Sequence, residues 1–142
     1  MIRGEYDAAA AGSPEELLDD YRATLVDVIE SVGAETVVDR TGLSTETVES
    51  VRAGDGGDLA LRDAAAILAV DEGRPDADAV AAEARDVLLL GMTTAVVDVD
   101  TLASELNGPL EAKELQQKVE GRAPMTLAEY ASIHYHLREH TG

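Results

Sequence analysis

Residues 36–54, TVVDRTGLSTETVESVRAG, decide the fold that we predict from the sequence. They predict two short helices joined by a tight turn. Gly42 stands in the turn, where the backbone needs a positive φ. Ser44 can cap the second helix, because its hydroxyl can accept a hydrogen bond from a free N–H of the first turn. Gly54 then ends that helix. The apolar residues that we expect to hold the second helix against the first are Leu43, Val48 and Val51.

Helical periodicity continues on both sides of this stretch. Ser13 begins an apolar stripe with a spacing of 3.6 residues that ends at Gly33. Near the other end of the chain, Thr126 and Glu129 form a capping box that starts the last helix. No segment shows the sustained alternation of a strand, so the predicted fold class is all-α.

A long helix is expected over residues 78–97. Its second half, VLLLGMTTAVV at residues 87–97, is apolar on all sides, which predicts burial on every side. We therefore place Leu89 in a core shared by both halves of the chain, where an Asp would unfold both. Exposure of this segment would instead mark it as a dimer interface.

The order of predicted elements occurs twice along the chain. Gly54 answers to Gly121 at a separation of 67 residues, and Leu61 answers to Leu127 at 66. Any two helical halves can align by apolar period alone, but the shared glycine stops favour a duplication. The predicted organisation is two repeated modules packed around the long apolar helix. Its parts are a flexible N-terminal tail at 1–12, a first module at 13–74 and a second module at 75–142.

The chain of 142 residues has 29 acidic and 11 basic residues, a formal charge of −18. Arg outnumbers Lys by 9 to 2 and Ala reaches 23, which indicates a halophilic protein that works in molar salt. In such salt the Debye length is about 3 Å, so the self-repulsion is largely screened. The alternative is an ordinary acidic cytosolic protein. The lack of Cys excludes disulfides, Cys-ligated zinc and thiol catalysis.

Residues 36–54 resemble the helix-turn-helix of Cro and lambda-repressor-like proteins. DLALRDAAAILAV, at 58–70, resembles the helix that follows recognition in that family, and LQQKVEGRAPMTLAEYASI, at 115–133, resembles the end of its recognition helix. This resemblance implies DNA binding. The whole chain also resembles an uncharacterised family of small acidic haloarchaeal proteins, through LGMTTAVVDVDT at 90–101 and VEGRAPMTLAEYA at 119–131.

The second module is the expected DNA contact, because the charge is −16 over residues 1–100 and only −2 over residues 101–142. Gln can pair with adenine, and Lys can reach guanine or phosphate. In the first module the corresponding helix exposes Glu46 and Glu49, whose carboxylates repel phosphates. A solvated helix face is the alternative interpretation of the second module. The candidate DNA-binding residues are Lys113, Gln116, Gln117 and Arg122.

Other kinds of site have little support in the sequence. No nucleophile–base pairing, P-loop or GxGxxG motif is present, so we expect no enzyme and no cofactor. His136 and His140 have a chelating spacing, but with His134 they lack a further ligand, so we expect surface histidines and no metal. There is no signal peptide and no apolar run of about 20 residues, so we expect a cytoplasmic protein with no membrane contact.

Two functions remain open. The first is a helix-turn-helix DNA-binding protein, a transcriptional regulator of a halophile that contacts double-stranded DNA through the second module. The second is a protein-interaction module that keeps the fold without binding DNA, with a protein partner or a second copy in a homodimer. The number and placement of positive charges distinguish them.

Overall fold

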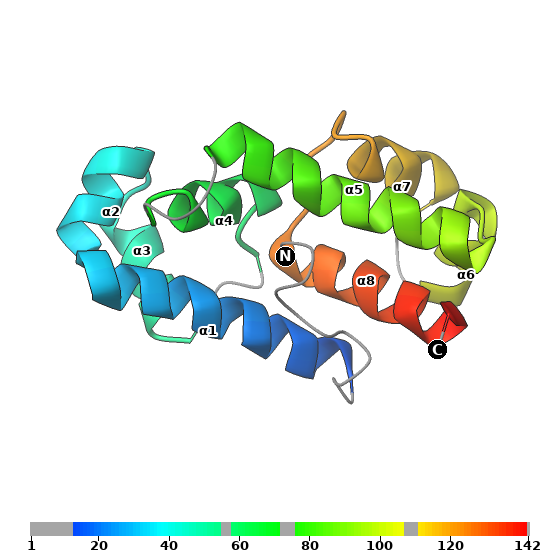
Figure 1. The fold of residues 1–142 in the computed structure, drawn as a ribbon, viewed down its shortest axis with the longest axis horizontal. Coiled ribbons are helices and arrows are strands. Elements are labelled where there is room, and N and C mark those ends of the chain that lie inside the picture. Colours follow the sequence, from blue (N-terminus) through cyan, green and yellow to red (C-terminus); the bar gives the residue numbers. More distant parts are fainter. Residues whose placement is uncertain (1–12, 55–57, 72–75, 107–110, 142) are drawn as a thin grey trace.

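The computed structural model describes residues 13–54, 58–71, 76–106 and 111–141. These residues form eight helices and no strand, so the all-α prediction is confirmed (Figure 1). The predicted tail at 1–12 and the predicted break at Asn107, Gly108 and Pro109 lie outside the described residues. The helices are α1 Pro14–Val32, α2 Ala34–Thr41, α3 Thr45–Arg52, α4 Leu61–Leu68, α5 Ala77–Ala95, α6 Val99–Leu106, α7 Ala112–Val119 and α8 Leu127–Thr141.

Side-chain caps start several of these helices where the sequence predicts them. Ser13 Oγ accepts a hydrogen bond from Glu16 N at 3.2 Å, and Ser44 Oγ accepts one from Thr47 N at 3.1 Å. Asp76 caps α5 in the same way. Each cap satisfies an N–H group that has no partner inside the helix. Local sequence therefore fixes where α1, α3 and α5 begin.

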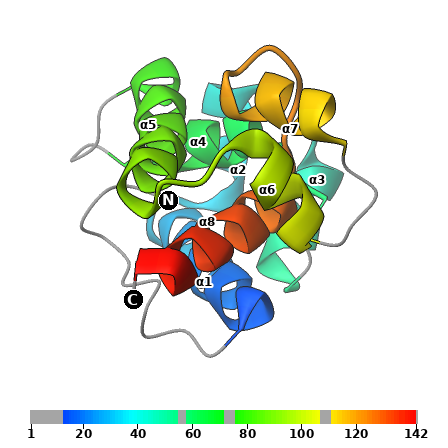
Figure 2. The same ribbon diagram turned by 90° about the vertical axis from the view of Figure 1, so that its right-hand side faces the viewer.

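Four helices form the centre of the molecule. α1 packs against α4 and α8, and α5 packs against the same two helices. The short pair α2 and α3 lies at one end of this group, and the pair α6 and α7 lies at the other (Figure 1). Figure 2 views the molecule from the end that carries α6 and α7. The four central helices thus hold two pairs of short helices apart.

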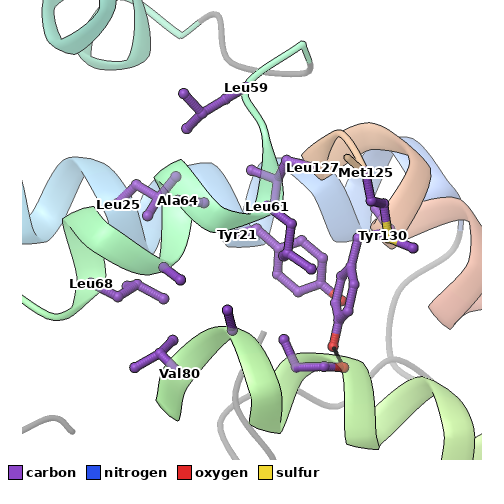
Figure 3. Packing of buried hydrophobic residues seen from close by; sticks show 14 of the residues in the cluster. Tyr21, Leu25, Leu59, Leu61, Ala64, Leu68, Val80, Met125, Leu127 and Tyr130 are labelled. Carbon is purple, nitrogen blue, oxygen red and sulfur yellow. Dashed lines mark hydrogen bonds between the residues drawn. The ribbon is translucent and has the colours of Figure 1, made fainter. Parts of the chain in front are cut away.

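The first half (α1–α4) and the second half (α5–α8) are joined by a reciprocal pair of backbone hydrogen bonds. Leu61 N donates to Met125 O, and Leu127 N donates to Leu59 O, both at 2.7 Å. Leu59 and Met125 are 66 residues apart, as are Leu61 and Leu127. The two segments that precede α4 and α8 therefore make the same contact with each other. All four of these side chains are buried there (Figure 3).

Two tyrosines fill the centre of the core. The rings of Tyr21 on α1 and Tyr130 on α8 have centroids 5.6 Å apart, and both side chains are fully buried. Tyr130 Oη donates to the carbonyl oxygen of Ala84 at 3.0 Å (Figure 3). Tyr21 Oη forms a hydrogen bond of 2.6 Å with Nδ1 of His134. Both hydroxyls are thus satisfied inside the core, as buried polar groups must be.

The second half of α5 differs from its prediction. Leu88 is fully buried, but Leu89 is 40% exposed and Leu90 is 53% exposed. The helix ends at Val96, which has a left-handed φ of 55° and is 90% exposed. Burial on every side was therefore wrong, and so was the placement of Leu89 in the shared core. The physical reason is that α4 and α8 cover only the side of α5 that carries Leu88.

Leu88 and Leu89 provide a matched pair of substitutions that tests this correction. We expect Leu88→Ala to lower the free energy of unfolding by about 2–5 kcal/mol, because it leaves a cavity in the core. Leu89→Ala removes a half-exposed side chain, and we expect a loss below about 1 kcal/mol. Urea denaturation followed by circular dichroism measures both. Equal losses in the two variants would contradict the described packing.

His134 gives the fold a predicted dependence on pH. Burial, with a smaller effect from the Arg138 charge, lowers the pKa of His134 to about 4. An unfolded His has a pKa of about 6.5, so between these values the unfolded chain binds a proton that the folded chain does not. We expect stability to fall by up to about 3 kcal/mol from this group as the pH falls through that window.

Urea denaturation at several pH values between 6.5 and 4 tests this expectation. His134→Gln cannot take up the proton, so its stability should fall less steeply across the window. His136→Gln is the matched control on the same helix, and it should keep the slope of the original protein. A slope unchanged by His134→Gln would refute the role given to His134.

Candidate nucleic-acid interface on α7

One side of α7 is fixed in the core, and this decides which side chains face outward. Leu115 and Val119, four residues apart, are both buried. Lys113 and Gln116 are consequently exposed, and Gln117 is half-buried. These three predicted site residues share one surface, which we call the α7 face. The fourth, Arg122, is exposed in the turn after the helix.

Glu120 joins two of the predicted residues. Gln116 Nε2 donates to Glu120 Oε2 at 3.1 Å, and Arg122 forms an ion pair with Oε1 of the same carboxylate. These hydrogen bonds, that from Gln116 first, lower the pKa of Glu120 below its ordinary value. A carboxylate therefore stands between the amide and the guanidinium. Any anionic partner has to compete with Glu120 for Arg122.

The turn after α7 is held rigidly. Gly121 has a φ of 80°, which favours glycine, and it lets the chain reverse. The N–H groups of Arg122 and Ala123 then donate to the carbonyl oxygen of Gln117 at 2.8 and 3.2 Å. This closes the carboxyl end of α7 in the way that glycine-ended helices usually close. The position of Arg122 relative to α7 is set by these backbone bonds.

Lys118 fastens α7 to the start of α8. Its ammonium lies 2.7 Å from both carboxylate oxygens of Glu129, and both side chains are largely buried. Glu129 also accepts a hydrogen bond from Thr126 N at 2.9 Å, while Thr126 Oγ1 accepts one from Glu129 N at 3.1 Å. The predicted capping box of α8 is therefore confirmed. The sequence did not indicate that Lys118 would complete it.

A cavity of about 400 Å³ adjoins Arg122, and the sequence analysis missed most of its charged residues. It lies between the start of α4, α5 and the turn after α7. We call it the basic cavity, because four cationic side chains line it against one acidic side chain. Arg62 and Arg85 come from distant segments, so no local motif could have grouped them with Lys118 and Arg122. The charged lining residues are Arg62, Arg85, Lys118, Arg122 and Asp78.

Comparison with known proteins identifies a family. The family model described as a family of unknown function, DUF5791, matches residues 17–140. The chain belongs to this family. The predicted resemblance to an uncharacterised family is thereby confirmed. No curated protein matches the chain, and no solved structure matches it.

The match includes α1 to α7 and almost all of α8, so the DUF5791 model covers both halves of the fold. The half without the α7 face differs sharply in charge. α3 exposes Glu46 and Glu49, and Arg52 is paired with Glu30 at 3.0 Å and with Glu49 at 3.2 Å. A cavity of about 540 Å³ beside α3 is lined by Glu46, Asp58 and Asp63, among others. This surface of the DUF5791 protein repels phosphate.

The histidines of this DUF5791 protein have separate contacts. His134 bonds to Tyr21, and Nδ1 of His136 lies 2.8 Å from the carbonyl oxygen of Ser132. The side chain of His140 lies outside the described residues. Within the described part of the chain, no three His, Cys, Asp or Glu side chains are placed to hold a metal ion together.

The hydrophobic helices of the DUF5791 protein were also compared with the length of a membrane span. Among the described helices, none is long and apolar enough by itself to cross a bilayer. α5 and α6 meet the length and composition test only as a pair, and they are bent by 100° between them.

Proposed function

We propose that this DUF5791 protein is a helix-turn-helix DNA-binding protein and acts as a transcriptional regulator in a salt-adapted cell. The observation that carries the proposal is the α7 face. It presents Lys113, Gln116 and Gln117 outward from a helix whose other side is buried. Gln and Lys are side chains that recognise base edges in the major groove.

The dimensions and placement of α7 support this proposal. An eight-residue helix is about 12 Å long, and the major groove is about 12 Å wide. α6 and α7 lie at one end of the molecule, away from α2 and α3 (Figure 1). Recognition needs a rigid helix. The buried Leu115 and the Lys118–Glu129 pair supply that rigidity.

The charge of the second half also supports the proposal. A net charge of −2 over residues 101–142 is weakly repulsive, while −16 over residues 1–100 disfavours contact by the rest of the chain. In molar salt the release of counterions adds little to affinity, so base contacts and shape have to supply the binding energy. A short polar face with one lysine is compatible with binding of that kind.

Selection from random duplexes in 2 M KCl, followed by fluorescence anisotropy on the selected sequence, tests the proposal. We expect Gln116→Ala to weaken binding about tenfold or more, because a bidentate Gln–adenine pair contributes about 1–3 kcal/mol. Glu49→Ala is the matched control, because Glu49 holds the corresponding place on α3, 67 residues earlier. It should leave the affinity unchanged.

Two results would overturn the proposed DNA contact. The first is a selection that enriches no duplex for the intact chain. The second is a loss of affinity as large for Glu49→Ala as for Gln116→Ala, since α3 is not part of the proposed contact.

A second candidate function is self-association, and the exposed end of α5 favours it. Leu89, Leu90 and Val96 are the large hydrophobic side chains that stand exposed among the described residues. Exposed apolar side chains grouped on one helix end are typical of a protein interface. A second copy of this chain would cover the same end of α5 on each side, as in a twofold dimer.

Sedimentation velocity over a range of protein concentrations tests this second candidate. We expect the original chain to form a dimer and Leu90→Lys to remain a monomer, because a buried unpaired charge opposes the contact. Ala79→Lys adds the same charge at an exposed position near the start of α5, and it should still form the dimer. A monomeric original chain at every concentration would remove this candidate.

A further inference from the structure

We propose that the basic cavity binds a small organic phosphate. This site is distinct from the α7 face, because Lys113, Gln116 and Gln117 do not line it. The proposal goes beyond DNA binding, and it stands whether or not the chain binds DNA. Only Arg122 belongs to both surfaces.

The charge of the lining is opposite to that of the whole chain. Four of the 11 basic residues line this cavity, and only one of the 29 acidic residues does so, which is Asp78. An acidic protein that is adapted to salt would be expected to surround a random hollow with carboxylates. Concentration of cations in one hollow instead creates a local field that attracts an anion.

Two of these four cations have no partner among the described residues. Lys118 is paired with Glu129, and Arg122 is paired with Glu120. No hydrogen bond or ion pair joins Arg62 or Arg85 to any residue in the described ranges. Guanidinium groups bind phosphate with two parallel hydrogen bonds when they are free to do so. Arg62 and Arg85 are therefore the side chains available to the ligand.

The first half shows how the same feature looks when it is neutralised. Arg22 of α1 lies 63 residues before Arg85 of α5. It bonds to the carbonyl oxygen of Gly54, which ends the segment after α3, and it forms an ion pair with Asp19. The residue 63 positions after Asp19 is Ala82. The carboxylate that occupies Arg22 thus has no counterpart beside Arg85.

Gly121 brings Arg85 close to the turn after α7. A Cβ atom built at Gly121 would lie 2.8 Å from Nε of Arg85 and 3.0 Å from its Cζ. Only glycine leaves room for the guanidinium at that place. The absence of a side chain at Gly121 therefore keeps Arg85 against the turn that also carries Arg122.

The start of α4 adds a second source of positive potential. Ala60, Leu61 and Arg62 line the cavity, and Ala60 offers no side-chain cap to the first turn of this eight-residue helix. The N-terminal end of a helix carries partial positive charge and favours an anion. This potential adds to that of the unpaired guanidinium groups of Arg62 and Arg85.

The size of the cavity favours a small molecule over a phosphate of the DNA backbone. A volume of about 400 Å³ is far more than one phosphate group needs, and it falls within the usual range for small-molecule pockets. Ala81, Pro124 and Met125 add apolar surface to the lining. This surface fits the organic part of a ligand whose phosphate is held by Arg62 and Arg85.

Titration with inorganic pyrophosphate, followed by phosphorus NMR on the full chain, tests this site. The salt concentration should be the lowest at which the chain stays folded, because salt screens the contact. We expect saturable binding that Arg85→Gln weakens about tenfold or more, as befits loss of a bidentate charge-assisted contact. Arg22→Gln is the matched control in the first half, and it should bind like the original chain. Circular dichroism checks that both variants are folded.

Several outcomes decide the proposal. No saturable binding by the original chain would overturn it, and so would equal weakening by Arg85→Gln and Arg22→Gln. Displacement of a bound DNA duplex by pyrophosphate would assign the cavity to the DNA backbone, which overturns the small-molecule site. Unchanged pyrophosphate binding by Gln116→Ala would support a site separate from the α7 face, even if the protein binds no DNA.

Discussion

The structure depends on the contact between the segments that precede α4 and α8. Leu59 and Leu61 exchange backbone hydrogen bonds with Leu127 and Met125, and all four side chains are buried. Each half covers the apolar side of the other through this contact, because α1 and α5 both pack on α4 and α8. Hydrophobic burial supplies the main driving force, and the paired backbone groups avoid the cost of leaving buried donors unsatisfied.

Two surfaces of opposite character are built on this common frame. α3 and its surroundings carry exposed carboxylates, whereas α7 carries lysine and glutamine, and the basic cavity lies between α4, α5 and the turn after α7. The frame sets the positions, and a few charged side chains decide what each surface can bind. Replacement of an acid such as Asp19 by Ala82 at the corresponding place is enough to leave Arg85 free. Function in this family therefore has to be sought in such differences between the halves.

Local signals in the sequence were sufficient to predict the helices. Ser13, Ser44 and Asp76 cap where a hydroxyl or carboxylate precedes an apolar stripe, and the buried Leu115 defines the outward side of α7. The covered side of α5 could not be predicted, because an all-apolar helix has no polar side to reveal its orientation. The basic cavity was also out of reach. It depends on helix packing that brings together residues far apart in sequence, and no periodicity records that.

The reciprocal contact has a consequence for how such a protein can arise. When equivalent residues of two halves contact each other, the arrangement has the form of an isologous interface, as found in twofold dimers. A single-copy chain with the same segment could make this contact with its own duplicate. Fusion of two copies would then retain every hydrogen bond of the pair while freeing each half to change its surface alone. An obligatory dimer would have to change both surfaces at once, whereas the fused chain can keep one acidic and turn the other toward anions.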